Sequence, residues 1–246
     1  MMVAQTNHLL ATLPDSVPLT LRLKRHLLSK DQVLFDVGQP IREVYFPLGA
    51  VVSLLTPLAS GETVETAMAG RDGVIGALAA FGAKHATSRA LVQISDECLS
   101  CEVEALTSAI ANSPELRSII IAHERALLAH VQQSAACNAT HRLESRLARK
   151  LLRAVDLRGH QELLLTQDHL AQMLGARRTT VTLIAQSFKD AGMITYRRGH
   201  IVVCDVVKLQ AVACECYRTV KENYAGLLRG KSKDRAQVEE STETTS

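Results

Sequence analysis

The stretch from Leu165 to Cys204 constrains the fold most, because two short amphipathic segments are separated there by a single glycine. Apolar residues of the first segment share one helical face, and those of the second recur at i, i+3, i+4 and i+7. Gly175 stands where the chain must reverse within about three or four residues, a conformation that side chains resist. Thr166 is placed to cap the first helix with its hydroxyl. The pattern predicts a helix-turn-helix packed through Leu170, Ala171, Leu174, Val181, Ile184, Ala185 and Phe188.

The predicted second helix begins with polar residues that include two arginines. In a helix-turn-helix the first turns of this helix enter the DNA major groove, where an arginine fork matches the O6 and N7 acceptors of guanine. We expect Arg178 to read a base; an ordinary solvated pair with Arg177 is the alternative. The nearby threonines are expected to touch phosphate or a thymine methyl, with plain surface threonines as the alternative. The predicted DNA contacts of the two helices are Thr166, Gln167, Arg177, Arg178, Thr179, Thr180 and Thr182.

After Gly192 the apolar pattern changes to period two on both sides of a basic turn at residues 197–200. This pattern predicts a two-stranded hairpin, a wing, with Arg197 and Arg198 at its tip. Arginines so placed lie along the phosphate backbone, where they add affinity but little specificity. The charge distribution agrees, since residues 141–200 hold 11 Lys and Arg against 5 Asp and Glu, whereas residues 1–140 hold 10 against 13.

The chain has 246 residues, of which 47% are hydrophobic, enough for the cores of two compact domains. It contains no apolar run near the ~20 residues of a membrane span, and its start lacks the pattern of a secretory signal. We therefore expect a cytoplasmic protein without membrane contacts. The sequence has no P-loop, nucleophile elbow or triad-like setting, so we expect no enzymatic activity.

Six cysteines are scattered along the chain, which argues against a disulfide framework and for reduced thiols. Cys98 and Cys101 have C-x-x-C spacing, but their setting predicts a strand, in which residues i and i+3 point to opposite faces. A second Cys or His pair is not apparent beside them, so two half-buried strand cysteines are favoured over a metal or redox site. Cys214 and Cys216 lie in a predicted helical stretch, Val206 to Leu228, and are assigned no role. We expect no metal.

Residues 31–105 consist of short apolar runs punctuated by glycine, typical of an antiparallel barrel or roll. From Ser113 the pattern becomes helical and continues to an interruption at residues 138–140, which we interpret as a hinge. The sequence therefore predicts an α+β protein: a jelly-roll-like β-roll sensory domain at 1–112, a long dimerisation helix at 113–139, a winged helix-turn-helix at 140–228 and a disordered tail at 229–246.

The long helix carries a seam of residues in alternating steps of four and three. An isolated helix would leave such a seam partly exposed, whereas two copies would cover it mutually. We expect a homodimer through this seam; a helix packed only on its own roll is the alternative. The predicted interface residues are Leu116, Ile120, His123, Leu127 and His130.

A glycine-punctuated roll, a long helix, a hinge and a winged helix-turn-helix in this order resemble the Crp/Fnr superfamily of bacterial transcription regulators. The resemblance is most specific where the signature alanine, glycine, valine and isoleucine of the family match Ala171, Gly175, Val181 and Ile184. In many members an arginine reads guanine at the position of Arg178. Where members often carry glutamate and, later, arginine, this chain has Thr179 and Leu183, so we expect an operator that departs from the commonest consensus.

The resemblance also implies an effector pocket, at Gly76, Ala77, Ser88 and Arg89. Cyclic-nucleotide-binding members have a glutamate after the glycine and an arginine one position earlier than Arg89. Ala77 cannot accept a ribose hydroxyl, and a shift of one place turns a strand residue to the opposite face. The paired N-terminal cysteines of iron-sulfur members are missing as well. Neither cyclic AMP control nor an iron-sulfur cluster is expected, and the cofactor, if any, is unknown.

The leading hypothesis is a homodimeric, sequence-specific transcriptional regulator that binds double-stranded DNA at a two-fold operator, with RNA polymerase as a further candidate partner. Two alternatives stay open. One is a dimeric effector-binding module whose DNA reader is vestigial, and the other is a regulator that does respond to a cyclic nucleotide.

Overall fold

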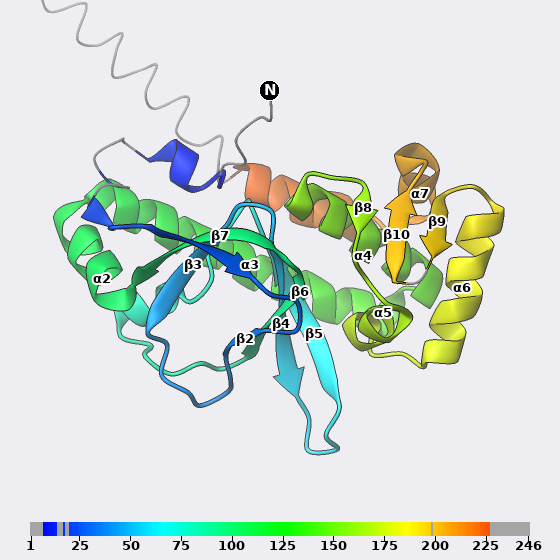
Figure 1. Ribbon diagram of the computed structural model, residues 1–246, viewed down its shortest axis with the longest axis horizontal. Coiled ribbons are helices and arrows are strands. Elements are labelled where there is room, and N and C mark those ends of the chain that lie inside the picture. The colour runs from blue at the N-terminus through cyan, green and yellow to red at the C-terminus, as the bar shows by residue number, and fades with distance from the viewer. Residues whose placement is uncertain (1–6, 14–16, 18–19, 198, 227–246) are drawn as a thin grey trace, which may run out of the picture.

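The computed structural model describes residues 7–13, 17, 20–197 and 199–226. A β-roll lies at one end of the molecule and a helix-rich unit with a small sheet at the other, with the long helix α3 (Pro114–Thr140) running beside the roll (Figure 1). This α+β arrangement confirms the predicted fold class. The tail expected to be disordered, residues 229–246, lies outside the described residues.

The roll is built from two antiparallel sheets, as the glycine-punctuated pattern predicts. Side chains from both sheets pack into one core that includes Leu28, Phe35, Val52, Val92 and Cys98. Aliphatic and small residues dominate this core, in keeping with a chain that is only 3% aromatic. The first sheet has the order β1 (Lys24–Leu28), β7 (Asp96–Glu102), β3 (Glu43–Pro47), and the second has the order β2 (Val33–Phe35), β6 (Arg89–Ile94), β4 (Val51–Pro57), β5 (Thr63–Ala69).

Cys98 and Cys101 both lie on β7 but on opposite faces of the strand, as expected of residues i and i+3. Cys98 packs in the core between the two sheets, while Cys101 packs in a second core formed with the helices. Burial raises the pKa of each thiol to about 12. The two sulfurs therefore form neither a pair nor a reactive site, which confirms the prediction of two strand cysteines.

The helical region begins earlier than the sequence pattern indicates. Helix α2 (Val103–Asn112) follows β7 directly, whereas we expected helix only from Ser113. Ser113 instead separates the two helices: its side chain accepts a hydrogen bond from the Leu116 amide and caps α3, with Pro114 at the first helical position. The predicted interruption at residues 138–140 is wrong, because these residues are helical and α3 ends only at Thr140. Helix α4 (Leu143–Arg158) follows after residues 141 and 142, and two short 3-10 helices lie in the described part of the roll, η1 (Leu10–Thr12) and η2 (Ala77–Phe81).

The seam of α3 that we predicted to face a partner is covered by its own chain. Leu116 and Ile120 lie in the core beneath the roll, and the His123 Nε2 accepts a hydrogen bond of 3.2 Å from the Val74 amide. The ring of His130 stacks edge-on against Tyr224, with centroids 6.1 Å apart. Leu116, Ile120, His123 and His130 are buried and Leu127 is half-buried, so the predicted interface must be corrected.

The second unit combines the predicted helix-turn-helix and wing with two further elements. A short strand, β8, pairs with β10, so the wing sheet has three strands rather than two, in the order β8–β10–β9. The predicted continuous helix from Val206 is broken at residues 213–215 and resumes at 216–226. Asp205 caps the first part, as expected, by accepting a hydrogen bond from the Lys208 amide. The elements are α5 (Gln167–Leu174), α6 (Arg178–Asp190), β8 (Glu162–Leu163), β9 (Ile194–Arg197), β10 (His200–Val203) and α7 (Val206–Val212).

Helix α4 joins the two units through buried charges. Lys150 forms an ion pair with Glu65 of β5, and Ser53 of β4 donates a hydrogen bond to the same carboxylate. One turn further along α4, the Arg153 guanidinium donates two hydrogen bonds to the Asp72 carboxylate. The distances are 2.6 Å from Nη1 to Oδ2 and 3.3 Å from Nη2 to Oδ1. These contacts fix α4 against the roll and thereby fix the position of the helix-turn-helix behind it. Among the described residues, no helix is both long and apolar enough to span a membrane.

Candidate nucleic-acid interface

The helix-turn-helix has the geometry that its sequence predicts. Gly175 adopts φ 57°, in the left-handed region, and ends α5. The Thr166 hydroxyl accepts a hydrogen bond from the His169 amide and caps α5 at its start. Helices α5 and α6 pack through a common core that includes all of the apolar positions named from the sequence: Leu170, Ala171, Leu174, Val181, Ile184, Ala185 and Phe188.

The N-terminal turn of α6 is exposed, and its polar side chains face away from the core. Arg177, Arg178, Thr179 and Thr180 are all exposed. Arg178 contacts Asp168 of α5, with Nε 3.3 Å from Oδ1, but the arginine side chain keeps 63% of its surface accessible. Exposed ion pairs contribute only about 0.2–1 kcal/mol, so this contact costs little to exchange for a contact with DNA.

Thr182 and Gln167 have a structural role in the free protein. The Thr182 hydroxyl lies 2.9 Å from the Gln167 Oε1 and 2.9 Å from the Arg178 carbonyl oxygen. The first contact joins the start of α5 to α6, so both side chains hold the recognition helix in place. Contact of either residue, or of the capping Thr166, with DNA stays a prediction.

Leu183 is the largest apolar side chain exposed on α6, with 73% of its surface accessible. From the sequence this position is notable only for lacking the arginine that relatives often carry. In the major groove an apolar side chain can contact the C5-methyl group of thymine. Leu183 lies on the exposed face of α6 in its second turn, so its exposure makes it a candidate DNA contact.

The wing contacts α6 through β9, and its two strands β9 and β10 pair antiparallel as the predicted hairpin requires, with His200 opposite Arg197 and Ile201 opposite Tyr196. Arg197 is exposed. Arg198, the second predicted wing contact, lies outside the described residues. The described part of the tip therefore offers one cation to a DNA backbone.

The four predicted effector residues lie in two parts of the roll, Gly76 and Ala77 at η2 and Ser88 and Arg89 at the start of β6. Gly76 has φ 84° and precedes the buried Ala77 at the start of η2. Arg89 is half-buried at the start of β6 and donates two hydrogen bonds to the Asp36 carboxylate, with Nε–Oδ1 3.0 Å and Nη2–Oδ2 2.6 Å. Ala90 next to it points into the roll core and is fully buried, so Arg89 lies on the opposite face; Ser88 is half-buried beside it.

The Arg89–Asp36 contact also accounts for the charge state of both groups. The hydrogen bond from Arg89 lowers the pKa of the Asp36 carboxyl, and the same hydrogen bond raises the pKa of Arg89. The guanidinium is thus already neutralised by a carboxylate of its own chain.

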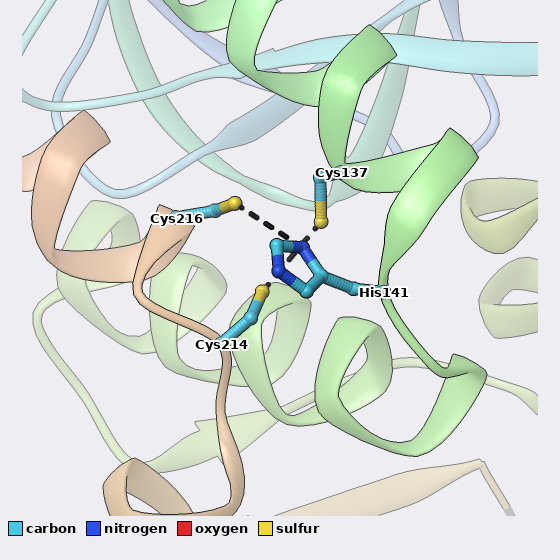
Figure 2. Close-up of side chains that lie close together, drawn as sticks. All are labelled: Cys137, His141, Cys214 and Cys216. Carbon is cyan, nitrogen blue, oxygen red and sulfur yellow. Dashed lines mark hydrogen bonds between the residues drawn. The ribbon is translucent and has the colours of Figure 1, made fainter.

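A group of potential metal ligands lies between the two units, which the sequence analysis did not anticipate. Cys137, His141, Cys214 and Cys216 bring three sulfurs and a ring nitrogen together, all within 4.8 Å of one another (Figure 2). The first two residues lie at the end of α3 and the others at the break after α7. The prediction that Cys214 and Cys216 lie within one helical stretch is wrong for Cys214, which lies in the break, whereas Cys216 begins the next helix. In the sequence, the two cysteines are separated by a single residue, and this spacing alone does not reveal the group.

Comparison with known proteins agrees with this geometry. Residues 145–212 match the family model of the Crp-like helix-turn-helix domain. A global nitrogen regulator from Nostoc sp. (strain PCC 7120) is 26% identical over 192 residues, which cover 73% of this chain and 85% of that protein. Among solved structures, FixK2 from Bradyrhizobium japonicum has 16% identity and a TM-score of 0.66, covering 78% of this chain and 98% of the other. A Crp-family transcriptional regulator from Thermus thermophilus has 18% identity and a TM-score of 0.64, covering 77% and 96%.

Residues 145–212 therefore form a helix-turn-helix domain that matches the Crp-like domain family, and the chain as a whole has the fold of the solved regulators named above.

Proposed function

We propose that this protein is a transcriptional regulator of the Crp/Fnr type that acts as a homodimer, reads a two-fold DNA operator through α6, and does so without control by cyclic AMP. The observation that carries the proposal is the exposed first turn of α6, where the side chains of residues 177–180 are all accessible to solvent. Arg178 is placed to read guanine, and Arg197 of the wing to contact phosphate. Because the first turn of α6 is exposed and keeps its arginines, the alternative of an effector-binding module with a vestigial DNA-binding domain is disfavoured. Contact with RNA polymerase stays a prediction.

The exposed face of α3 supports dimerisation, although through other residues than the predicted seam. Ile121 and Leu128 keep 44% and 58% of their surface accessible, and exposed Ala135 follows after a further seven residues. A seven-residue repeat of apolar side chains keeps one stripe facing a neighbouring helix. We therefore place the dimer contact on this stripe, on the side of α3 that the roll does not cover.

Replacing Leu128 with glutamate is expected to give monomers. Two facing carboxylates without partners would have to lose water on association, which disfavours the interface. Light scattering after size-exclusion chromatography measures the mass, and Leu27→Glu is the control because Leu27 is an exposed leucine on β1, with 71% of its surface accessible. A variant Leu128→Glu that keeps the mass of a dimer would place the interface elsewhere.

Independence from cyclic AMP is supported by the chemistry of the roll. A buried cyclic phosphate needs a positioned cation, but Arg89 is engaged by Asp36. A ribose hydroxyl needs an acceptor, and Ala77 has none. The interior between the sheets is occupied by side chains of the chain itself.

Addition of cyclic AMP is expected to leave the melting temperature and the affinity for DNA unchanged. A ligand that bound the native state at 100 times its Kd would add about 2.7 kcal/mol to the free energy of unfolding, a shift that calorimetry detects easily. Such a shift with cyclic AMP, lost in Arg89→Gln, would show that Arg89 leaves Asp36 to hold the phosphate.

A further inference from the structure

We propose that Cys137, His141, Cys214 and Cys216 form a binding site for one thiophilic divalent metal ion, of which zinc(II) is the reference. Figure 2 shows the four side chains converging from two segments, the end of α3 and the break between α7 and the helix at 216–226. Three cysteines and one histidine are a common ligand set of tetrahedral zinc sites. These four residues lie apart from the exposed turn of α6, so metal binding at this site does not require DNA binding.

The distances fit a single ion. Cys137 Sγ lies 3.6 Å from Cys214 Sγ, and Cys216 Sγ lies 3.5 Å from His141 Nδ1. Bonds of about 2.3 Å to sulfur and about 2.0 Å to nitrogen in a tetrahedron place the ligand atoms about 3.5–3.8 Å apart. A four-iron cluster binds each thiolate at a separate iron, and a two-iron cluster divides its four ligands between two irons, so either cluster holds some of the ligand atoms farther apart than a single ion does. The spacing therefore favours one metal ion over an iron-sulfur cluster.

Neighbouring side chains orient the ligands from outside. His141 turns Nδ1 toward the sulfurs, while its Nε2 lies 3.1 Å from the Glu215 Oε1. A carboxylate on the outer nitrogen of a ligating histidine fixes the ring and raises its basicity. Gln133 donates a hydrogen bond of 3.0 Å to Cys216 Sγ. Neither contact is explained by packing of an apolar core.

Burial and charge also suit anionic sulfur. Cys137, Cys214 and Cys216 are buried, and three thiolates around a divalent ion carry one net negative charge. Arg149 of α4 is buried and interacts electrostatically with Cys137. Its Nε and Nη2 have no hydrogen-bond partner among the described residues. A positive charge is thus held beside the thiols.

One side of the group borders the surface of the molecule. A surface hollow of about 550 Å³, lined in part by Cys214, Glu215 and Tyr217, gives an ion a route to the group.

A bound ion would link the connection between α3 and α4 to the C-terminal helix. His141 is the residue that ends α3 ahead of α4, and Cys214 and Cys216 stand at the start of the helix that covers His130. Since the ligands are brought together only in the folded chain, binding is expected to raise the melting temperature.

The test uses the full chain, reduced, freed of metal with a chelator and titrated with cobalt(II). We expect one cobalt ion per chain, with the intense visible absorption of tetrahedral thiolate coordination, displacement by zinc(II), and a higher melting temperature with either ion. Cys216→Ala should abolish the absorption. Cys204→Ala is the matched control, because Cys204 is an exposed cysteine outside the group.

Glu215→Gln is the variant that separates ligation from folding. The Glu215 side chain keeps 63% of its surface accessible, so the fold should persist, whereas loss of the carboxylate that orients His141 should weaken metal affinity by about 10- to 100-fold. Absence of stoichiometric binding by the wild-type chain, undiminished absorption in Cys216→Ala, or more than one iron per chain together with labile sulfide would each overturn the proposal.

Discussion

Replacement of Arg178 by alanine is expected to weaken binding to the operator by about 1–3 kcal/mol, a loss of roughly 5- to 150-fold, and to relax the preference at one guanine in each half-site. The reason is geometric: the side chain stands exposed on the first turn of α6, and its guanidinium matches both acceptors of guanine. Fluorescence anisotropy with operator DNA and with the same DNA substituted at that guanine measures the effect.

Arg197→Ala is the matched control for this prediction. Arg197 lies on the wing, so its loss should weaken binding to all sequences alike and reduce the slope of log affinity against log salt by about one. If Arg178→Ala showed that uniform behaviour instead, Arg178 would be a phosphate contact rather than a base reader.

Replacement of Lys150 by methionine is expected to lower the free energy of unfolding by about 3–5 kcal/mol, because it leaves the Glu65 carboxylate buried without its counter-ion. Lys150 keeps 3% of its side-chain surface accessible and Glu65 none. Burial lowers the pKa of Lys150, and the nearby Glu65 opposes that effect. Chemical denaturation followed by circular dichroism measures the change.

The double variant Lys150→Met, Glu65→Leu tests whether the cost comes from the unpaired charge. Apolar replacement of both partners of a buried ion pair is often neutral or stabilising, so most of the lost stability should return. A double variant as unstable as the sum of its single variants would show that the two side chains do not act as a pair.

The helix-turn-helix was predictable from sequence because its determinants are local. The spacing of Leu170 and Leu174, the cap at Thr166 and the turn at Gly175 all lie within a few residues of one another. The roll was predictable in outline for the same reason, since glycines bound its short strands. The two-residue strand β8 was missed, as two residues carry no measurable period.

The dimer seam and the metal ligands depend instead on contacts between distant segments. Helical periodicity shows that Leu116, Ile120 and His123 share a face, but it does not show what covers that face; here the roll and Tyr224 do so. The two halves of the metal group are about 75 residues apart in the chain, and only the break after α7 turns Cys214 and Cys216 toward α3. Neither arrangement leaves a local pattern.

Whether this chain reads a defined, two-fold DNA sequence is tested by letting the purified full chain select bound duplexes from a random pool, followed by sequencing. We expect an enriched sequence with two-fold symmetry, half-site centres about 34 Å apart, one turn of DNA, and a guanine in each half-site that is no longer selected by Arg178→Ala. No enriched sequence, or an enriched sequence without two-fold symmetry, would contradict this expectation.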